Sequence, residues 1–237
     1  MGEMLEWLKR LDVELLLEIN GSESLFWDGV MKVITSTWVW LPMFVVLFCI
    51  LIRNNTLKSF FLTLAAIALT VTLCDQVASG ICKPLFERFR PTQDPYIMYL
   101  IDIVDGYRGG RFGFISSHAA NTFGVAVFLS CLFRSAPVSV LMYVWALLSS
   151  YSRIYLGVHY PGDILCGCLC GCLIGWLMFL LYRRLMRSVD SHRNQHWASG
   201  LYTSTGYLVD DVRLLTVTLL LTYALIPAIG IWLVGMR

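Results

Sequence analysis

Six apolar segments constrain this sequence more than any other feature. Each approaches the roughly 20 residues that an α-helix needs to cross the ~30 Å hydrocarbon core of a bilayer. Hydrophobic residues make up 57% of the 237 residues and charged residues 14%, so the chain has more apolar surface than one soluble core of this size buries. The sequence therefore predicts an all-α fold, a six-helix transmembrane bundle, with spans at 35–52, 59–79, 118–133, 137–155, 161–182 and 214–234.

The segment before the first span predicts a helix of another kind. Apolar residues recur there at helical spacing with charged residues between them, a pattern typical of an amphipathic helix. We expect residues 1–20 to form an interfacial helix in the membrane surface, or else a helix packed on the protein's flank. With no basic n-region and no uninterrupted apolar stretch, a signal peptide is not expected. The pattern comprises Met4, Leu5, Leu8, Leu11 and Leu15, and Asn20-Gly21-Ser22 predicts the turn that follows.

No repeat with a period of about 20 to 50 residues divides the chain. Residues 1–237 are therefore predicted to form a single domain. The net charge of +2 is spread over separate groups and predicts no nucleic-acid partner. Nearly all of the eight cysteines lie in apolar segments, where Cys behaves as a small hydrophobe. The sequence carries no signal for an oligomeric state.

The connectors alternate between two sides of the membrane, and Lys and Arg are usually enriched on the cytoplasmic side. Both sides contain many basic residues, so their number alone does not set the orientation. If several basic residues of the loops 80–117 and 152–160 bind an anionic substrate, only the basic residues on the opposite side, here called the first group, report the topology. That opposite side is then the cytoplasm, and the two loops face outside. The first group comprises Arg53, Lys58, Arg134, Arg183, Arg184, Arg187 and Arg193.

These two loops contain most of the unusual polar residues. Ionisable groups beside a bilayer are costly, so two imidazoles, several cations and an acid at one membrane face predict a functional site. A structural network of ion pairs is the alternative, but the acids are too few to pair every cation and the imidazoles would be unexplained. The residues are Lys83, Arg90, Ser116, Ser117, His118, Ser152, Arg153, His159 and Asp163.

Together these residue types suit phosphate chemistry. Guanidinium and ammonium groups bind phosphate oxygens and neutralise the charge that spreads over them during transfer. An imidazole that attacks phosphorus must be neutral and oriented, and Asp163 follows His159 by one helical turn, where it can accept a hydrogen bond from the second ring nitrogen. The imidazole of His118 is then available to protonate the departing alkoxide.

Two segments resemble signatures of the type 2 phosphatidic acid phosphatase family. Lys83-Pro-Leu-Phe-Glu-Arg-Phe-Arg90-Pro91 is similar to the first signature, a Lys followed seven residues later by Arg-Pro. Ser152-Arg153, five residues, His159, three residues and Asp163 match the third signature at every fixed position. By residue frequencies the latter pattern arises by chance in about one chain per thousand of this length.

The second signature of that family usually reads Pro-Ser-Gly-His. Ile115-Ser116-Ser117-His118 departs from it at two positions and keeps the Ser and the His. The family's Gly offers its backbone N–H to phosphate, and Ser117 can do the same if its backbone conformation is not restricted to glycine. The resemblance covers residues 83–163, about a third of the chain, within a predicted active-site region of 80–163.

The resemblance implies a role for each matching residue. His159 is similar to the nucleophile that forms a phosphohistidine, Asp163 to the acid that orients it, and His118 to the general acid. The implied phosphate ligands are Lys83, Arg90, Arg153, Ser116 and the backbone N–H of Ser117.

The implied enzyme is an integral membrane lipid phosphatase that needs no metal and no cofactor. Its partners are the bilayer and a membrane lipid phosphate, which enters laterally at the periplasmic or extracytoplasmic face of a bacterial inner membrane. Candidate substrates are undecaprenyl pyrophosphate, phosphatidylglycerophosphate, phosphatidate and the phosphates of lipid A, and the sequence does not choose among them.

Three other functions use similar residues. A lipid phosphotransferase resolves the same phosphohistidine with an alcohol instead of water, and the sequence does not separate the two. A vanadate-dependent haloperoxidase has a similar pocket but is soluble, which the six spans oppose. A non-catalytic anion transporter has no need of a His followed one turn later by Asp.

Several other features are predicted to lie outside the site. Four cysteines occupy alternate positions of a predicted span, so Cys166 and Cys170 face one way and Cys168 and Cys172 another, which opposes a metal site. The glycines between and beyond them recur every four residues and favour close helix packing. His192 and His196 are spaced as metal ligands on a helix would be, but no nearby Cys or Glu completes a metal site. Five charged residues lie in a loop over the pocket, where they can influence substrate choice. Asp75 is also left out. These residues are Cys166, Cys168, Cys170 and Cys172; Gly167, Gly171 and Gly175; His192 and His196; and Asp94, Asp102, Asp105, Arg108 and Arg111.

Overall fold

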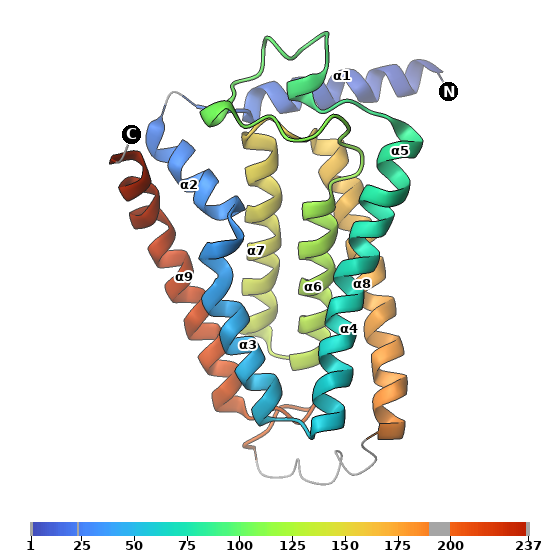
Figure 1. Ribbon diagram of the computed structural model, residues 1–237, viewed down its shortest axis with the longest axis vertical. Helices are drawn as coiled ribbons and strands as arrows, with labels where there is room; N and C mark the ends of the chain where they lie inside the picture. The colour runs from blue at the N-terminus through green and yellow to red at the C-terminus, as the bar shows by residue number, and fades with distance from the viewer. Residues whose placement is uncertain (1, 23, 190–199, 236–237) are drawn as a thin grey trace.

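Helices stand side by side in a bundle, and one helix lies across its end (Figure 1). The computed structural model describes residues 2–22, 24–189 and 200–235. The all-α prediction is confirmed, and the described residues contain two isolated β-bridges but no strand. The main helices are α1 (Gly2–Ile19), α2 (Leu25–Thr35), α3 (Leu41–Arg53), α4 (Leu57–Asp75), α5 (Lys83–Phe86), α6 (Ser117–Phe133), α7 (Ala136–Tyr155), α8 (Pro161–Val189) and α9 (Val209–Gly235).

The predicted count of six spans is only partly supported. Three helices are long and apolar enough to cross a membrane, namely Leu57–Phe86, Pro161–Val189 and Val209–Gly235. A fourth span results if Leu25–Thr35 and Thr37–Arg53, which meet at 62°, are counted together. The α6 helix is apolar but has 17 residues. Because it packs against α4, α7 and α8, much of its surface meets protein instead of lipid.

Helix boundaries differ from the prediction at the first two spans. The predicted span 35–52 contains a break, because Thr37–Trp40 forms a 3₁₀ turn between α2 and α3. The helix α2 itself was not predicted. The predicted span 59–79 continues through a π-helical segment, Gln76–Cys82, to Phe86. Pro84 follows the π-helical segment almost directly, where the regular i→i−4 hydrogen bonds are already interrupted, so its missing N–H disrupts less than it would in a regular helix.

One of the predicted loops consequently begins later than expected. Lys83 lies on a helix instead of in the loop 80–117. Arg153 lies on the last turn of α7, Ala136–Tyr155, which agrees with the predicted span 137–155. Each side chain is thus presented from regular backbone at one end of the bundle. A basic residue at the end of an apolar helix resembles a loop residue in a hydropathy pattern, which explains the difference at Lys83.

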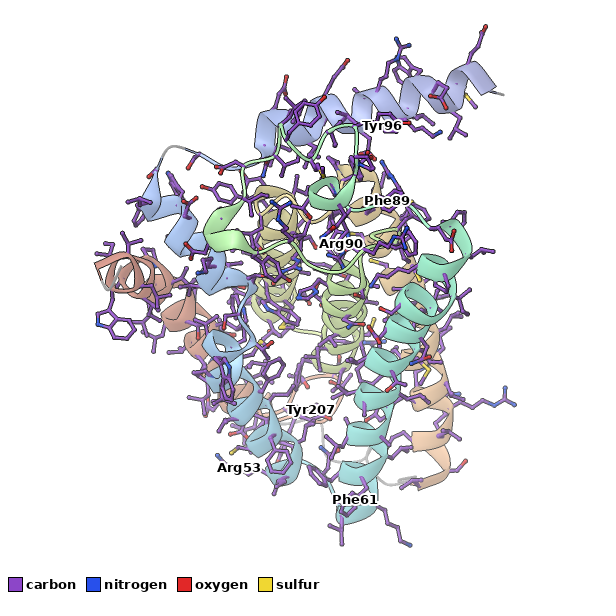
Figure 2. All side chains as sticks on the ribbon, turned by 45° about the horizontal axis from the view of Figure 1, so that its top comes forward. Arg53, Phe61, Phe89, Arg90, Tyr96 and Tyr207 are labelled. Atoms are coloured by element: carbon purple, nitrogen blue, oxygen red, sulfur yellow. The ribbon has the colours of Figure 1, made fainter. Side chains whose placement is uncertain are left out.

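The arrangement of the connectors at two ends agrees with the prediction. Figure 1 shows α1, the long connector after α5 and the start of α8 at one end, and the α3–α4 and α6–α7 connectors at the other. In Figure 2, Arg90 lies at the α1 end, whereas Arg53 and Tyr207 lie at the opposite end. Arg193 falls outside the described residues. Which end faces the cytoplasm remains a prediction.

The N-terminal helix is only partly covered by the rest of the protein. Its first half is exposed, including Met4, Trp7 and Leu8. Its second half packs on the protein, where Leu16 is buried with Tyr160 and Ile164. The turn predicted after it is present, because the chain reverses at Gly21 with a positive φ of 67°. The position of α1 in a membrane interface stays a prediction.

The small-residue stripe of α8 packs against α6, as predicted. A Cβ atom on Gly167 would lie 2.6 Å from the carbonyl oxygen of Ser116, and one on Gly171 or Gly175 would overlap the α6 backbone at Ala120 or Gly124. The two helices are therefore as close as their backbones permit. This contact sets where the first turn of α6 lies relative to the first turn of α8.

We expect a Gly171→Ala substitution to destabilise the protein by about 1–3 kcal/mol, because the added methyl group forces α6 and α8 apart. Thermal unfolding in detergent measures the change, and the activity is expected to fall with it. Leu173→Ala, which alters an exposed side chain of the same helix, is the control. Equal unfolding temperatures for Gly171→Ala and the wild type would contradict close packing at this position.

Candidate active site

A short loop between α7 and α8 carries His159, and the first turn of α8 carries Asp163. The His159 Nδ1 atom lies 3.4 Å from Asp163 Oδ2, and the backbone N–H of Tyr160 donates to the same oxygen at 3.1 Å. Both side chains are buried, with exposed fractions of 1% and 0%. When Nδ1 carries the proton and donates a hydrogen bond to this carboxylate, the lone pair of the ring is on Nε2.

The surroundings of His159 favour the neutral imidazole. Burial, together with the charges of Arg90, Arg153 and Lys83, holds the pKa of His159 well below its ordinary value. Desolvation and nearby positive charge both oppose uptake of a proton. At neutral pH the ring therefore keeps an unprotonated nitrogen, which a nucleophile requires.

Arg90 faces the nitrogen of His159 that Asp163 does not contact. Its Nη1 lies 3.2 Å from His159 Nε2 and donates to the carbonyl of Val158 at 3.2 Å. Its Nε donates to the carbonyl of Phe112 at 3.1 Å. Burial and the neighbouring Arg153 lower the pKa of Arg90. An anion bound beside Nε2 would relieve the repulsion between these two guanidinium groups.

The other two cations among the predicted phosphate ligands come from different helices. Lys83 Nζ donates to Ser117 Oγ at 3.2 Å, which links α5 to the start of α6. Arg153 is held by two hydroxyl groups, donating to Thr35 Oγ1 at 2.8 Å and to Tyr107 Oη at 2.9 Å. Both cations are thus oriented by neutral oxygen atoms, which leaves their charge uncompensated.

The site has a surplus of positive charge. In the part of the chain that the structure describes, Lys83, Arg90 and Arg153 form no ion pair with a carboxylate. The Nε of Arg153 is buried and has no hydrogen-bond partner there. Buried N–H groups and charges are costly unless paired. A phosphate group has the charge and the acceptor oxygens to satisfy all three side chains.

The N-terminus of α6 brings the second signature to the same place. Ser116 is the N-cap, and its hydroxyl accepts from the Ala119 N–H at 3.4 Å. The N–H groups of Ser117 and His118, in the first turn, have no partner within the helix and suit an anion. His118 is exposed, unlike His159, and lies within electrostatic range of His159 and of the three cations. The structure thus brings together all eight residues of the predicted site.

Comparison with known proteins supplies the family. The PAP2 superfamily matches residues 59–187, more than half of the chain. The chain belongs to the PAP2 superfamily. A lipid A 4'-phosphatase of Bacteroides thetaiotaomicron is 43% identical to this PAP2 protein over 190 residues, which cover 79% of this chain and 84% of the relative. A lipid A 4'-phosphatase of Porphyromonas gingivalis is 31% identical over 219 residues, covering 91% and 89%.

Solved PAP2 structures have a similar fold. Aquifex aeolicus LpxE aligns with a TM-score of 0.55 and 24% identity over 72% of this chain and 95% of its own. A transmembrane PAP2-type phosphatidylglycerolphosphate phosphatase of Bacillus subtilis aligns with a TM-score of 0.55 and 22% identity, over 78% and 89%. These identities support the fold alone. The family, its relatives and the apolar helices make this protein an integral membrane lipid phosphatase of the PAP2 type.

Two charged residues of this PAP2 site had no predicted role. Arg88 donates to Asp163 Oδ1 at 2.9 Å and to Asp12 Oδ2 at 2.6 Å. Arg88 lies two residues before Arg90, so its place in the first signature was a usable signal. Asp12 gives no such signal, because it belongs to the N-terminal helix and the sequence does not show where that helix packs.

Asp75 is connected to the PAP2 site through one hydroxyl group. Ser79 Oγ donates to Asp75 Oδ1 at 3.2 Å, and Lys83 Nζ donates to Ser79 Oγ at 2.9 Å. The three residues recur every fourth position through the π-helical segment. Asp75 therefore lies behind Lys83 without pairing with it directly.

The loop over the PAP2 site is folded by its own charged residues. Asp94 accepts from the Tyr160 hydroxyl at 2.9 Å, and Arg108 donates to the carbonyl of Thr92 at 3.1 Å. Asp105 pairs with Lys32. Their role in substrate choice stays a prediction. Of the other loop charges, Asp102 is held through its backbone by Asn20, and Arg111 lies 5.2 Å from the ring centres of Phe89 and Phe112.

The sulfur atoms of this PAP2 protein lie outside the site. All eight cysteines are free, and the four on α8 share the helix with the glycine stripe. No group of three or more His, Cys, Asp or Glu side chains among the described residues is arranged to hold a metal ion. His192 and His196 fall outside the described residues.

Acidification is expected to destabilise the wild type more than a His159→Gln variant. Below about pH 6.5 the unfolded chain binds a proton at this imidazole, whereas the folded chain does so only at much lower pH. The free energy of unfolding therefore falls as the pH falls, by at most about 1.4 kcal/mol per pH unit for this group. Thermal unfolding in detergent between about pH 7.5 and pH 5.5 measures it. Parallel curves for the two proteins would mean that His159 titrates normally.

Proposed function

We propose that this phosphatase removes the phosphate group of a lipid A-type glycolipid through a phosphohistidine on His159. The observation that carries the mechanism is the arrangement around that ring. Asp163 faces Nδ1, and Arg90 lies 3.2 Å from Nε2. A phosphate group bound by Arg90 is therefore held beside the nitrogen that carries the lone pair. The chemistry needs such proximity, because positioning supplies much of the rate in phosphoryl transfer.

In the first half of the reaction, Nε2 of His159 forms a bond to phosphorus. The bond from phosphorus to the lipid oxygen breaks, and that oxygen leaves with the electron pair and takes a proton from His118. The positive charge that develops on the His159 ring is stabilised by Asp163. The resulting phosphohistidine keeps the phosphoryl group in the site after the lipid has left.

The phosphoryl oxygens are held throughout by the surplus of positive charge. Lys83, Arg90 and Arg153 neutralise the charge that spreads over these oxygens in the transition state. The unpaired Nε of Arg153 and the N–H groups at the start of α6 supply further donors. Ser116 contributes to phosphate binding mainly as the N-cap of α6, because it holds in place the helix terminus whose N–H groups face the phosphate.

In the second half, water attacks the phosphohistidine. The bond from nitrogen to phosphorus breaks, and its electron pair returns to Nε2. His118, neutral after the first half, takes a proton from the water, so inorganic phosphate leaves and both imidazoles return to their starting states. A lipid alcohol in place of water would give phosphotransfer through the same steps.

The relatives support lipid A among the four candidate lipids. Two curated relatives, one of them 43% identical over most of both chains, carry the name lipid A 4'-phosphatase. The phosphate on the distal sugar of lipid A is a monoester, which needs a proton on its leaving oxygen. The negative charge of a bound phosphate offsets the neighbouring cations, which otherwise oppose a proton on His118, and so allows His118 to supply that proton. Because phosphatidate and phosphatidylglycerophosphate are also phosphomonoesters, the choice rests on the names of these relatives, and on that basis we assign this chain a 4'-phosphomonoester of a lipid A-type disaccharide.

We expect purified protein in detergent to release inorganic phosphate from lipid A and less or none from undecaprenyl pyrophosphate, phosphatidylglycerophosphate or phosphatidate. His159→Ala is expected to lower that release by roughly 10³-fold or more, because it removes the nucleophile. Mass spectrometry of the lipid product identifies which phosphate was removed. Activity is expected to persist in EDTA.

The control for that experiment is Lys58→Ala, which changes an exposed cation in the first turn of α4, next to the α3–α4 connector. Phosphate release that survives His159→Ala would exclude the phosphohistidine. Loss of lipid phosphate without free phosphate, with the group found on a second lipid, would make the protein a phosphotransferase. Release from another lipid alone would keep the mechanism and change the substrate.

We further infer that the site faces the periplasm, at the outer surface of a bacterial inner membrane. The basic residues at the α1 end include the three uncompensated cations of the site, which a substrate phosphate neutralises. The basic residues of the opposite end have no such use, so they serve as the topological signal.

A cysteine at position 184 tests this orientation. Arg184→Cys is expected to resist a membrane-impermeant maleimide in intact cells and to react after permeabilisation, because position 184 lies at the cytoplasmic end. Tyr96→Cys, at an 82% exposed position of the α1 end, is the control and is expected to react in intact cells. The reverse pattern would invert the topology.

A further inference from the structure

Arg88 joins two carboxylates that come from distant parts of the chain. Its Nη1 donates to Asp163 Oδ1 at 2.9 Å, and its Nη2 donates to Asp12 Oδ2 at 2.6 Å. The guanidinium group also lies 3.9 Å from the centre of the Tyr160 ring. Arg88 therefore differs from the three other cations of the site, because its charge is already balanced by carboxylates instead of being available to a phosphate.

Asp12 is bound to the helix that carries Asp163. Its Oδ1 accepts from the backbone N–H of Gly162 at 2.6 Å, in the first turn of α8, where a carboxylate suits the unpaired N–H groups and the helix dipole. One carboxylate of α1 thus holds both the start of α8 and Arg88. The end of α1 is fixed independently, since Asn20 and Gly21 donate to the carbonyl of Tyr155.

The two oxygens of Asp163 have separate partners. Oδ2 faces His159 Nδ1 and accepts from the Tyr160 N–H, whereas Oδ1 accepts from Arg88. A fully buried carboxylate that lost Arg88 would lose its cation and the contact that fixes its rotation. The pKa of Arg88 agrees with this, because the neighbouring carboxylates raise it despite burial.

We propose that Arg88 and Asp12 are positioning residues that hold the Asp163 carboxylate against His159, so that the N-terminal helix takes part in building the active site. Arg88 acts directly on Asp163, and Asp12 acts by holding Arg88. The proposal rests on the assignment of His159 and Asp163 as the nucleophile and its orienting acid. It gives α1 a function beyond that of a membrane-surface helix.

Asp12→Asn, Arg88→Ala and the double variant, in the full-length protein in detergent, test the proposal. Asp12→Asn keeps the oxygen that accepts from Gly162 and removes the charge that Arg88 binds. Arg88→Ala is expected to lower kcat about 10- to 100-fold, as for loss of a supporting contact behind a catalytic ligand. KM is expected to change little, because Lys83, Arg90 and Arg153 still bind the phosphate. Arg88→Lys is expected to restore part of kcat.

The double variant separates positioning from a structural role. If Asp12 acts through Arg88, adding Asp12→Asn to Arg88→Ala lowers kcat no further, whereas a purely structural contact of Asp12 lowers it again. Arg10→Ala and Glu14→Gln, at exposed positions of α1, are the matched controls and are expected to leave kcat unchanged. Should Arg88→Ala fail to fold, Asp12→Asn is compared with Glu14→Gln, and a lower kcat at equal unfolding temperature is required.

His159→Ala, assayed in parallel, distinguishes the two levels of the hypothesis. Activity in His159→Ala would overturn the proposed function. Loss of activity in His159→Ala together with wild-type kcat in Arg88→Ala or Asp12→Asn would overturn the positioning role alone. A raised KM with unchanged kcat in Arg88→Ala would also overturn it, because that result identifies Arg88 as a phosphate ligand.

Discussion

The buried carboxylate of Asp163 is the interaction on which the site depends. It accepts from the Tyr160 N–H and from Arg88 and faces the ring of His159. The two donors come from different segments of the chain. The Tyr160 N–H belongs to the α7–α8 loop, and Arg88 belongs to the connector after α5. A carboxylate without water needs such donors, so the fold around it must bring several chain segments to one point. The geometry around His159, the proposed nucleophile, follows from that requirement.

The close packing of α6 on α8 serves the same end. Glycines on α8 allow the backbones to meet, and the N–H of Ser116 donates to the carbonyl of Asp163 at 3.1 Å. The first turns of the two helices, one carrying His118 and the other Asp163, are therefore held together in part by backbone contacts. Side-chain chemistry is placed here by contacts that involve no catalytic atom.

The sequence predicted what depends on local spacing and composition. The all-α class, the two ends of the bundle, the turn at Gly21 and the α8 stripe follow from hydropathy, turn residues and the period of a helix. The resemblance on three short segments identified the family, and the structure brings its eight residues together. Their roles in the reaction remain predictions, as does the number of membrane spans.

What could not be predicted depends on long-range packing. Asp12 reads as one of several acids on an amphipathic helix, since nothing in its neighbourhood shows that it meets Gly162 and Arg88. The break at Thr37–Trp40 was missed because apolar composition continues through it. The extension of the second span to Phe86 was missed because Lys83 and Pro84 resemble loop residues, although a π-helical segment accommodates both.

The bend between α2 and α3 has a consequence for the site. Thr35, the last residue of α2, holds Arg153 through its hydroxyl group, and the chain turns by 62° immediately beyond it. The angle of a bent or tilted span responds to the thickness of the surrounding hydrocarbon. Arg153, a proposed phosphate ligand, is thus held by a part of the fold whose geometry is expected to follow the bilayer, so the acyl-chain length of the host membrane is expected to influence the proposed site.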